Sequence, residues 1–290
     1  MSAVKITEGI YSVGIQNPNM RVFDIVMKTD SGTTYNSYLV RGSEKTALIE
    51  TCHEGFFEQY LENIREVCPL EEIDYIIMNH NEPDHSGSLA KLLELMPNAK
   101  VLASQAGSMY IRNITNRSDL EVQKVKDGET LDLGNRVLTF LFAPNLHWPD
   151  SMFTWVEDAK TLFTCDFLGC HYCEPYTFDY NIAYPKAYDA ALELYYAAIF
   201  GPFGSFVRKG LEKIKALPTA PELRRLKRRL FRYRHFIASS MSLLAITASR
   251  GACVSTCRRT NRMRQKRKFP KLLKLPKSPK RRPEPCKTGF

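Results

Sequence analysis

The feature that most constrains this chain is a group of metal-binding residue types directly after a short apolar run. The run, Asp74–Met78, is rich in β-branched residues and predicts a buried strand. His80, Glu82, Asp84 and His85 follow it within six positions. Folds of the α/β type bind ligands where strands end, and imidazole with carboxylate suits iron, manganese or zinc. An isolated histidine near an acid is more often part of a polar loop, but four such residues after one strand favour a metal site.

Two further candidates follow later predicted strands. His147 comes after the strand that ends near Phe142, and Asp166 comes after the run 161–164. Taken alone, the first could be a hydrogen-bonded loop histidine and the second a helix N-cap. Together with the first cluster they give three histidines and three carboxylates from three strand ends. An aspartate between two ions can bridge them, which favours a dinuclear centre with metals about 3.5–4 Å apart.

The alternation of short β-rich runs and helical patterns predicts an α/β fold, with two packed sheets and helices outside them. The other expected strands are Ile10–Val13, Arg21–Met27, Tyr35–Val40, Thr46–Glu50, a run near Val101, Arg136–Phe142, Met152–Val156 and Thr161–Thr164. The expected helices are Gly55–Val67, Ser86–Leu95, Gln105–Ile114, Lys186–Ile199 and Phe206–Ala216.

Charge divides the chain into two parts. Residues 221–290 contain 22 of the 41 Lys and Arg but two of the 31 acids, so this part carries +20 and the first 220 residues carry −10. The helical and strand patterns stop at Leu217-Pro218. We therefore expect a folded domain over 1–217 and a basic tail over 218–290, which is either disordered or the product of a reading-frame shift. Nucleic-acid binding by the tail is the rival hypothesis, but no RNA- or DNA-binding motif accompanies the charges.

The sequence predicts a cytoplasmic protein without a membrane segment. The N-terminus lacks the pattern of a secretory signal, and the longest apolar stretch, about 236–248, is too short to span a bilayer. The eight cysteines are expected to be unpaired thiols. A single Cys170-x-x-Cys173 pair lacks the four thiolates of a structural zinc or rubredoxin-type site.

The order His-x-Glu-x-Asp-His, a distant His and a distant Asp resembles the ligand pattern of the flavodiiron proteins, also called rubredoxin:oxygen oxidoreductases. Three flanking segments are similar to that family, at 79–89, 144–152 and 195–203. The resemblance covers about residues 4–216. It implies a metallo-β-lactamase-like fold, which is an αββα sandwich, and an oxidoreductase that reduces O2 to water or NO to N2O. The ligand pattern serves both substrates, so the choice between them stays open.

The resemblance also implies roles for single residues. His80, Glu82 and His147 would bind one iron, Asp84 and His85 the second, and Asp166 would bridge the two. His171 matches a family histidine beside the iron pocket, and we expect it to face the substrate as a catalytic residue without binding metal.

The chain departs from the family pattern after residue 216. The family's last histidine ligand is not matched: Lys227 and Arg228 stand in that neighbourhood, and the surroundings of His235 differ. The flavodoxin-like domain that binds FMN in the family has no counterpart in the pattern of 218–290. We therefore expect a weak second iron and an enzyme that is crippled or needs flavin in trans. The family further implies rubredoxin or a similar electron carrier as partner, and a head-to-tail homodimer.

Two other functions remain open from the sequence. Hydrolases of the same superfamily resemble His-x-His-x-Asp-His and bind zinc, whereas this chain has Glu82 at the second position. The added negative charge favours a metal that cycles between two oxidation states, which zinc does not do. The third hypothesis is an inactive remnant whose basic tail binds nucleic acid.

Overall fold

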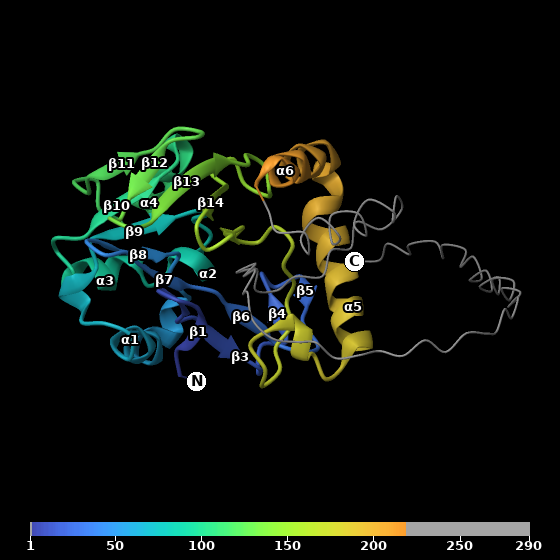
Figure 1. Cartoon of the computed structure of the whole chain (residues 1–290). Helices are drawn as coiled ribbons and strands as arrows, with labels where there is room; N and C mark the ends of the chain where they lie inside the picture. The colour runs from blue at the N-terminus through green and yellow to red at the C-terminus, as the bar shows by residue number, and fades with distance from the viewer. Residues whose placement is uncertain (1, 219–290) are drawn as a thin grey trace, which may run out of the picture. The chain divides into compact units, whose positions relative to one another are not determined.

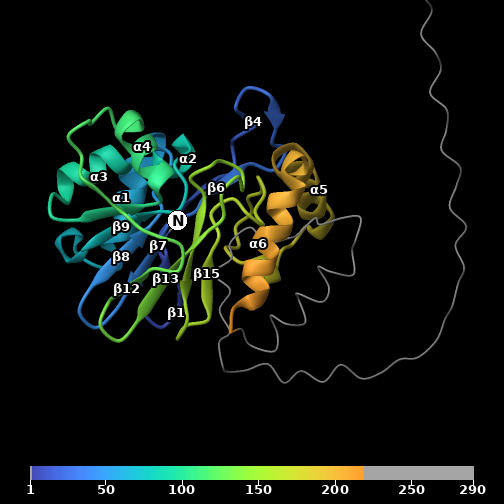
Figure 2. The same cartoon turned by 90° about the horizontal axis from the view of Figure 1, so that it is seen from above.

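The computed structural model describes residues 2–218. In this part of the chain two β-sheets pack face to face and helices cover both outer faces (Figure 1), which is plainest when the molecule is seen from above in Figure 2. This is the αββα sandwich that the sequence predicted. The basic tail, with Lys227, Arg228 and His235, lies outside the described residues, so the expectations about it stay predictions.

The larger sheet has seven strands, and its parallel half positions the candidate site. The strand order is β1 (Val4–Thr7), β2 (Ile10–Ser12), β7 (Tyr38–Arg41), β8 (Thr46–Ile49), β9 (Tyr75–Met78), β10 (Lys100–Ala103) and β11 (Val122–Lys124). The last four strands run parallel, with Ala47 beside Tyr75 and Ile76 beside Val101. Their carboxyl ends therefore meet at one edge of the sheet.

The smaller sheet is antiparallel. It consists of β12 (Thr130–Asp132), β13 (Val137–Phe142), β14 (Met152–Val156) and β15 (Thr161–Phe163). Two short ribbons lie beside the sheets, formed by β3 (Ile15–Asn17) with β6 (Thr33–Tyr35) and by β4 (Val22–Phe23) with β5 (Met27–Lys28).

The continuous strand expected over Arg21–Met27 is wrong. The chain reverses direction there, because Asp24 and Ile25 adopt φ angles of 47° and 68°. These left-handed conformations form the turn between β4 and β5. The apolar residues of the segment suggested a strand, but backbone torsion angles at non-glycine residues cannot be read from composition.

Three apolar layers hold the sandwich together. On the outer face of the large sheet, Tyr60, Leu92 and Ile111 pack against strand residues. They come from α1 (Phe57–Arg65), α3 (Leu89–Leu95) and α4 (Gln105–Ile114). Between the sheets, Ile77 and Phe140 belong to one fully buried cluster. The remaining short helices on this side are η1 (Glu54–Phe56), η2 (Leu70–Glu72) and α2 (Pro83–Ser86).

The third layer covers the small sheet. It is built by η3 (Asp179–Asn181), α5 (Pro185–Tyr195), the π-helical η4 (Tyr196–Phe200), η5 (Gly201–Phe203) and α6 (Gly204–Ala216). The stretch Pro185–Ala216 is long and apolar enough to cross a membrane by length and composition alone, with a mean hydropathy of 1.3 over an 18-residue window of which 22% is buried. Its residues Tyr188, Leu192 and Leu211 pack in the same cluster as Phe153 of β14. Part of this apolar surface is thus packed inside the fold, and the expected lack of a membrane segment stays a prediction.

The cysteines among the described residues agree with the expectation of unpaired thiols. Cys52, Cys68, Cys165 and Cys173 form no disulfide in residues 2–218. Cys253, Cys257 and Cys286 lie outside the described part.

Candidate metal centre

Four of the predicted ligands meet at the edge where the parallel strands end. His80 follows β9, Glu82 precedes α2, His147 lies in the loop between β13 and β14, and Asp166 follows β15. One ligand atom from each of these side chains lies within 4.8 Å of all the others. Residues up to 86 positions apart in sequence are thus brought together by the sheet edges, as the sequence predicted.

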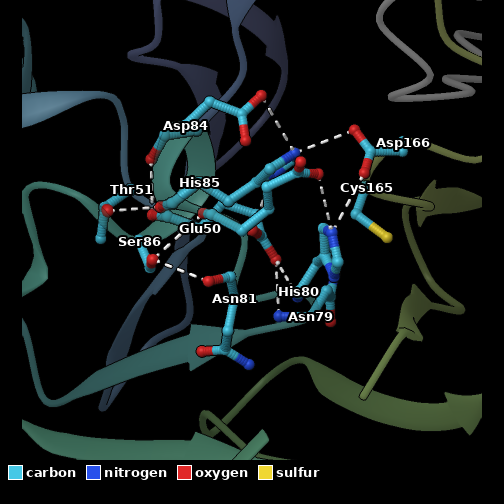
Figure 3. Close-up of polar contacts among 12 residues, drawn as sticks. Glu50, Thr51, Asn79, His80, Asn81, Asp84, His85, Ser86, Cys165 and Asp166 are labelled. Carbon is cyan, nitrogen blue, oxygen red and sulfur yellow. Dashed lines mark hydrogen bonds and ion pairs between the residues drawn. The ribbon is translucent and has the colours of Figure 1, made fainter. Parts of the chain in front are cut away.

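Asp166 lies between the imidazoles of His80 and His147 on one side and the imidazole of His85 on the other. Its Oδ2 lies 3.3 Å from His80 Nε2 and 3.2 Å from His147 Nε2. Its other oxygen, Oδ1, lies 2.9 Å from His85 Nε2; Figure 3 draws this contact as a dashed line. The two oxygens of one carboxylate therefore face two different sets of nitrogen donors, which is the arrangement of a bridging ligand.

The other two carboxylates are divided between the same two sets. Glu82 Oε2 lies 3.1 Å from His147 Nε2 and 3.4 Å from His80 Nε2. Asp84 Oδ2 lies 3.8 Å from His85 Nε2. The six residues thus form one subsite of His80, Glu82 and His147, and a second of Asp84 and His85, with Asp166 between them.

The proximity of acids and imidazoles changes their pKa values. Burial would lower the pKa of His80, but its contacts with Asp150 and Glu82 raise it to about 10. Burial would also lower the pKa of His147, but the carboxylates of Asp166 and Glu82 raise it to about 9. Burial would raise the pKa of Glu82, but His147 and His80 lower it to about 2. Without a cation in the site, the imidazoles hold protons that balance the acids.

Asp84 differs from the other two acids. Burial, together with the nearby negative charges of Asp166 and Glu82, raises its pKa to about 6, although His85 opposes the change. Its Oδ1 is buried and has no hydrogen-bond partner among the described residues. Buried carboxylate oxygens are rarely left unsatisfied, so this atom marks a place where a cation fits.

Two buried carboxylates outside the ligand set hold the imidazoles in position. Glu50 Oε2 lies 3.0 Å from His85 Nδ1, and its Oε1 accepts a hydrogen bond of 3.1 Å from the backbone N–H of His80. Asp150 Oδ1 lies 3.2 Å from His80 Nδ1, and its Oδ2 accepts a hydrogen bond from Asn81. With Nδ1 occupied in this way, each ring presents Nε2 to the centre, as is usual for metal-binding histidines.

The sequence analysis assigned no role to either of these two carboxylates. Glu50 follows β8, and Asp150 belongs to the same loop as His147. An acid directly after a strand was therefore an available signal for the first, and proximity to a predicted ligand for the second.

His171 lies beside the centre but outside the group of four. Its Nδ1 is 2.9 Å from Thr33 Oγ1, and its ring contacts Phe23 and Tyr195 at centroid distances of 4.4 and 4.9 Å. Its Nε2 is buried and has no partner among the described residues. Burial lowers its pKa to about 4, so the ring is neutral near pH 7. It lines a cavity of about 40 Å³ together with Asp84, His85 and Asp166.

The backbone is strained at several places around the centre. Glu50, Asn145 and Cys165 have φ angles of 61°, 63° and 46°, which non-glycine residues rarely adopt. Each lies within two residues of a candidate ligand or orients one. Strain of this kind is commonly found at functional sites, where the surrounding structure maintains it.

The donor set fits divalent metal ions. Two nitrogens and two oxygens are available at the first subsite, a composition suited to iron, manganese or zinc. The second subsite has one nitrogen and two carboxylates among the described residues, so it offers fewer ligands than the first.

Comparison with known proteins agrees with this architecture. The family model described as "ODP family beta lactamase" matches residues 33–192, which include all seven candidate site residues. The Flavo-diiron protein FprA2 of Clostridium acetobutylicum is 56% identical over 218 residues, which is 75% of this chain and 54% of that relative. The Type A flavoprotein fprA of Rhodobacter capsulatus is 37% identical over 217 residues, 74% of this chain and 49% of the relative.

Solved structures show the same fold. Rubredoxin oxygen:oxidoreductase from Desulfovibrio gigas matches with a TM-score of 0.72 and 36% identity, over 76% of this chain and 55% of that one. The flavodiiron protein from Giardia intestinalis matches with a TM-score of 0.71 and 31% identity, over 76% and 53% of the two chains. The chain spans about half the length of these relatives. The expected metallo-β-lactamase-like fold is confirmed.

Proposed function

The chain belongs to the flavodiiron protein family, and we propose that its described domain holds a non-haem di-iron centre that reduces O2 to water or NO to N2O. The proposal extends the activity of longer relatives to a chain that covers about half of their length. We assign His80, Glu82 and His147 to the first iron, Asp84 and His85 to the second, and Asp166 to the bridge. The observation that supports this best is the division of the Asp166 oxygens between the two imidazole groups.

Within this proposal the chain's own residues fix the ligands and restrict the substrate. Glu50 and Asp150 hold the rings of His85 and His80, so little reorganisation is needed when metal binds. The bound iron pair would supply two electrons, which suffice to reduce two NO molecules to N2O and water; reduction of O2 to two waters takes four, so the other two would come through the external electron carrier. His171, neutral and with no partner for Nε2 in residues 2–218, would face the substrate in the small cavity and could hold a proton or a hydrogen bond there.

A zinc hydrolase is the second candidate, and two observations disfavour it. Glu82 occupies the place where hydrolases of this superfamily have a histidine. The cavity beside the second subsite is about 40 Å³, which accommodates a few water-sized groups, because one buried water needs about 10–15 Å³. A diatomic gas fits this space, whereas a bulky ester or lactam would have to reach the metals from another side.

The partners and the location belong to the same proposal. We infer that electrons come from rubredoxin or a similar carrier by way of FMN, and that a head-to-tail homodimer would place flavin beside iron. We also infer a cytoplasmic location, a folded domain over 1–217 and a second iron held more weakly than the first. The last point follows because the described residues supply fewer ligands to the second subsite.

The test is metal analysis of full-length protein purified without oxygen, followed by NO consumption with a chemical reductant and added flavin. We expect between one and two irons per chain and NO loss that depends on them. Stoichiometric zinc with ester or lactam hydrolysis would overturn the proposal in favour of the hydrolase.

A further inference from the structure

A second cavity reaches His171 from the outside of the molecule. It has a volume of about 210 Å³ and lies between α5 and the segment 27–31 that contains β5. His171 and Tyr195 line both this cavity and the small one at the metal centre. Their rings meet edge to face with centroids 4.9 Å apart. This aromatic pair is therefore the partition between the outer cavity and the candidate centre.

One face of α5 forms the outer wall. Ala187, Ala190, Ala191 and Leu194 have the i, i+3, i+4, i+7 spacing that puts side chains on the same side of a helix, and all four line the cavity. Met27 contributes a further apolar side chain from the opposite segment. The methyl groups of the alanines leave a space that larger residues on this face would fill.

Apart from His171 and Tyr195, the polar residues of the cavity come from the segment 28–31, which includes Lys28 and Asp30, both exposed. Ala187 and Ala190 are also exposed, whereas Tyr195 is buried. The cavity is thus open to solvent at one end and ends at an aromatic wall at the other. Its lining becomes more aromatic toward the metal centre.

We propose that this cavity is the entry route by which a small, uncharged, weakly polar gas reaches the metal centre, with the His171–Tyr195 pair as its narrowest point. The proposal rests on the proposed function and adds to it the path and its lining residues. Neutral diatomic molecules partition into apolar space, whereas ions and large polar substrates do not. The cavity is also large enough, since an apolar cavity of about 150 Å³ already binds xenon or benzene.

The first test uses xenon as a probe of the metal-free full-length chain, with the alanine methyl groups labelled for NMR. We expect saturable shifts at the methyls of Ala190 and Ala191 as xenon pressure rises, and none at Ala103, which is fully buried in β10. The variant Ala190→Phe should abolish the shift at Ala191. Because Ala190 is exposed, this substitution should leave the fold intact, which the unchanged Ala103 signal would confirm. No xenon response at either cavity alanine would overturn the proposal.

The second test measures NO association with the ferrous-loaded chain by anaerobic stopped flow. Ala190→Phe should slow association by about tenfold or more, whereas the matched change Ala197→Phe, at an exposed alanine outside the cavity, should alter it by less than about twofold. An unchanged rate in Ala190→Phe would refute the route while leaving the proposed function standing. If the ferrous wild-type chain binds no NO at all, the proposed function fails, and the xenon result alone decides whether the cavity takes gas.

Discussion

At the scale of single residues, Glu82 most clearly separates an iron site from a zinc site. Its Oε2 lies within 3.4 Å of two imidazole nitrogens. We predict that Glu82→His shifts the metal preference from iron toward zinc, because a neutral imidazole, a softer donor that zinc binds well, replaces a hard anionic oxygen. Competitive loading with equal ferrous and zinc ions, followed by metal analysis, should show at least about a tenfold change in the bound ratio.

The control for this change is Glu121→His, which places a histidine at an exposed position away from the centre. It should load the two metals as the wild type does. A bound ratio in Glu82→His equal to that of the control would show that this carboxylate does not select the metal.

Glu50 and Asp150 allow the two subsites to be weakened separately. Glu50 contacts His85 of the second subsite, and Asp150 contacts His80 of the first. We predict that Glu50→Gln lowers affinity mainly for the second metal and Asp150→Asn mainly for the first, each by about 10–100-fold, as for other carboxylates that orient metal-binding histidines. Stepwise ferrous titration followed by spectroscopy measures both affinities; equal losses at both steps in both variants would contradict the separation.

The clustering of the candidate ligands could be predicted from the sequence, whereas the pairing of each imidazole with the carboxylate that orients it could not. His80, Glu82 and Asp84 occur in a short pattern directly after a β-branched run, so local sequence carries the information. Glu50 is 35 positions from the imidazole that it contacts. That pairing exists because β8 and β9 are neighbours in the sheet, which a single sequence does not specify.

At the scale of elements, the short helix α2 carries two candidate ligands and is held close to the loop after β8. The backbone N–H of Thr51 donates to the carbonyl of His85, and that of Ser88 donates to the carbonyl of Cys52. A Cβ atom on Gly87 would lie 2.8 Å from the backbone nitrogen of Glu54. Glycine is required here by close approach of two backbone segments.

We therefore predict that Gly87→Ala pushes α2 away from this loop, lowers the free energy of unfolding by about 1–3 kcal/mol and weakens metal binding at the second subsite. Chemical denaturation and ferrous titration measure the two effects. Gly204→Ala in α6 is the matched control, because its Cβ would have no atom nearer than 3.9 Å. That change should stabilise the protein by up to about 1 kcal/mol, as alanine usually does in a helix. Similar behaviour of both variants would disprove the close-approach argument.

Helices and strands could be predicted where the spacing of apolar residues was regular, and less well where the backbone reverses direction. The patterns over Gln105–Ile114 and Met152–Val156 predicted α4 and β14 with their observed bounds. Asp24 and Ile25 were placed in a strand but form a turn. The turn brings Phe23 against the ring of His171, and this contact between residues 148 positions apart had no local signature.

At the scale of the whole molecule, the buried site couples the stability of the fold to the binding of protons and of metal ions. The metal-free domain holds protons on His80 and His147, whose pKa values are about 10 and about 9. The protonated imidazoles contribute their full stabilisation to the fold at a pH below about 6.5, which is their pKa in the unfolded chain. This contribution is lost as the pH rises toward 9–10. A metal ion requires the neutral imidazoles, so its binding must displace these protons.

The difference in stability between the metal-loaded and metal-free forms should therefore widen as the pH rises from 6.5 to 8.5. Each displaced proton contributes about 1.4 kcal/mol per pH unit to metal binding, and that binding energy stabilises the folded form alone. Thermal unfolding of ferrous-loaded and chelator-treated protein at three pH values under argon measures this difference. The metal-free form should lose stability over the same range, because these imidazoles give up their protons in the unfolded chain above about pH 6.5 but still hold them in the folded form. A difference that stayed constant or narrowed with rising pH would mean that the imidazoles are already neutral before metal binds, and that the acids of the centre are balanced in another way.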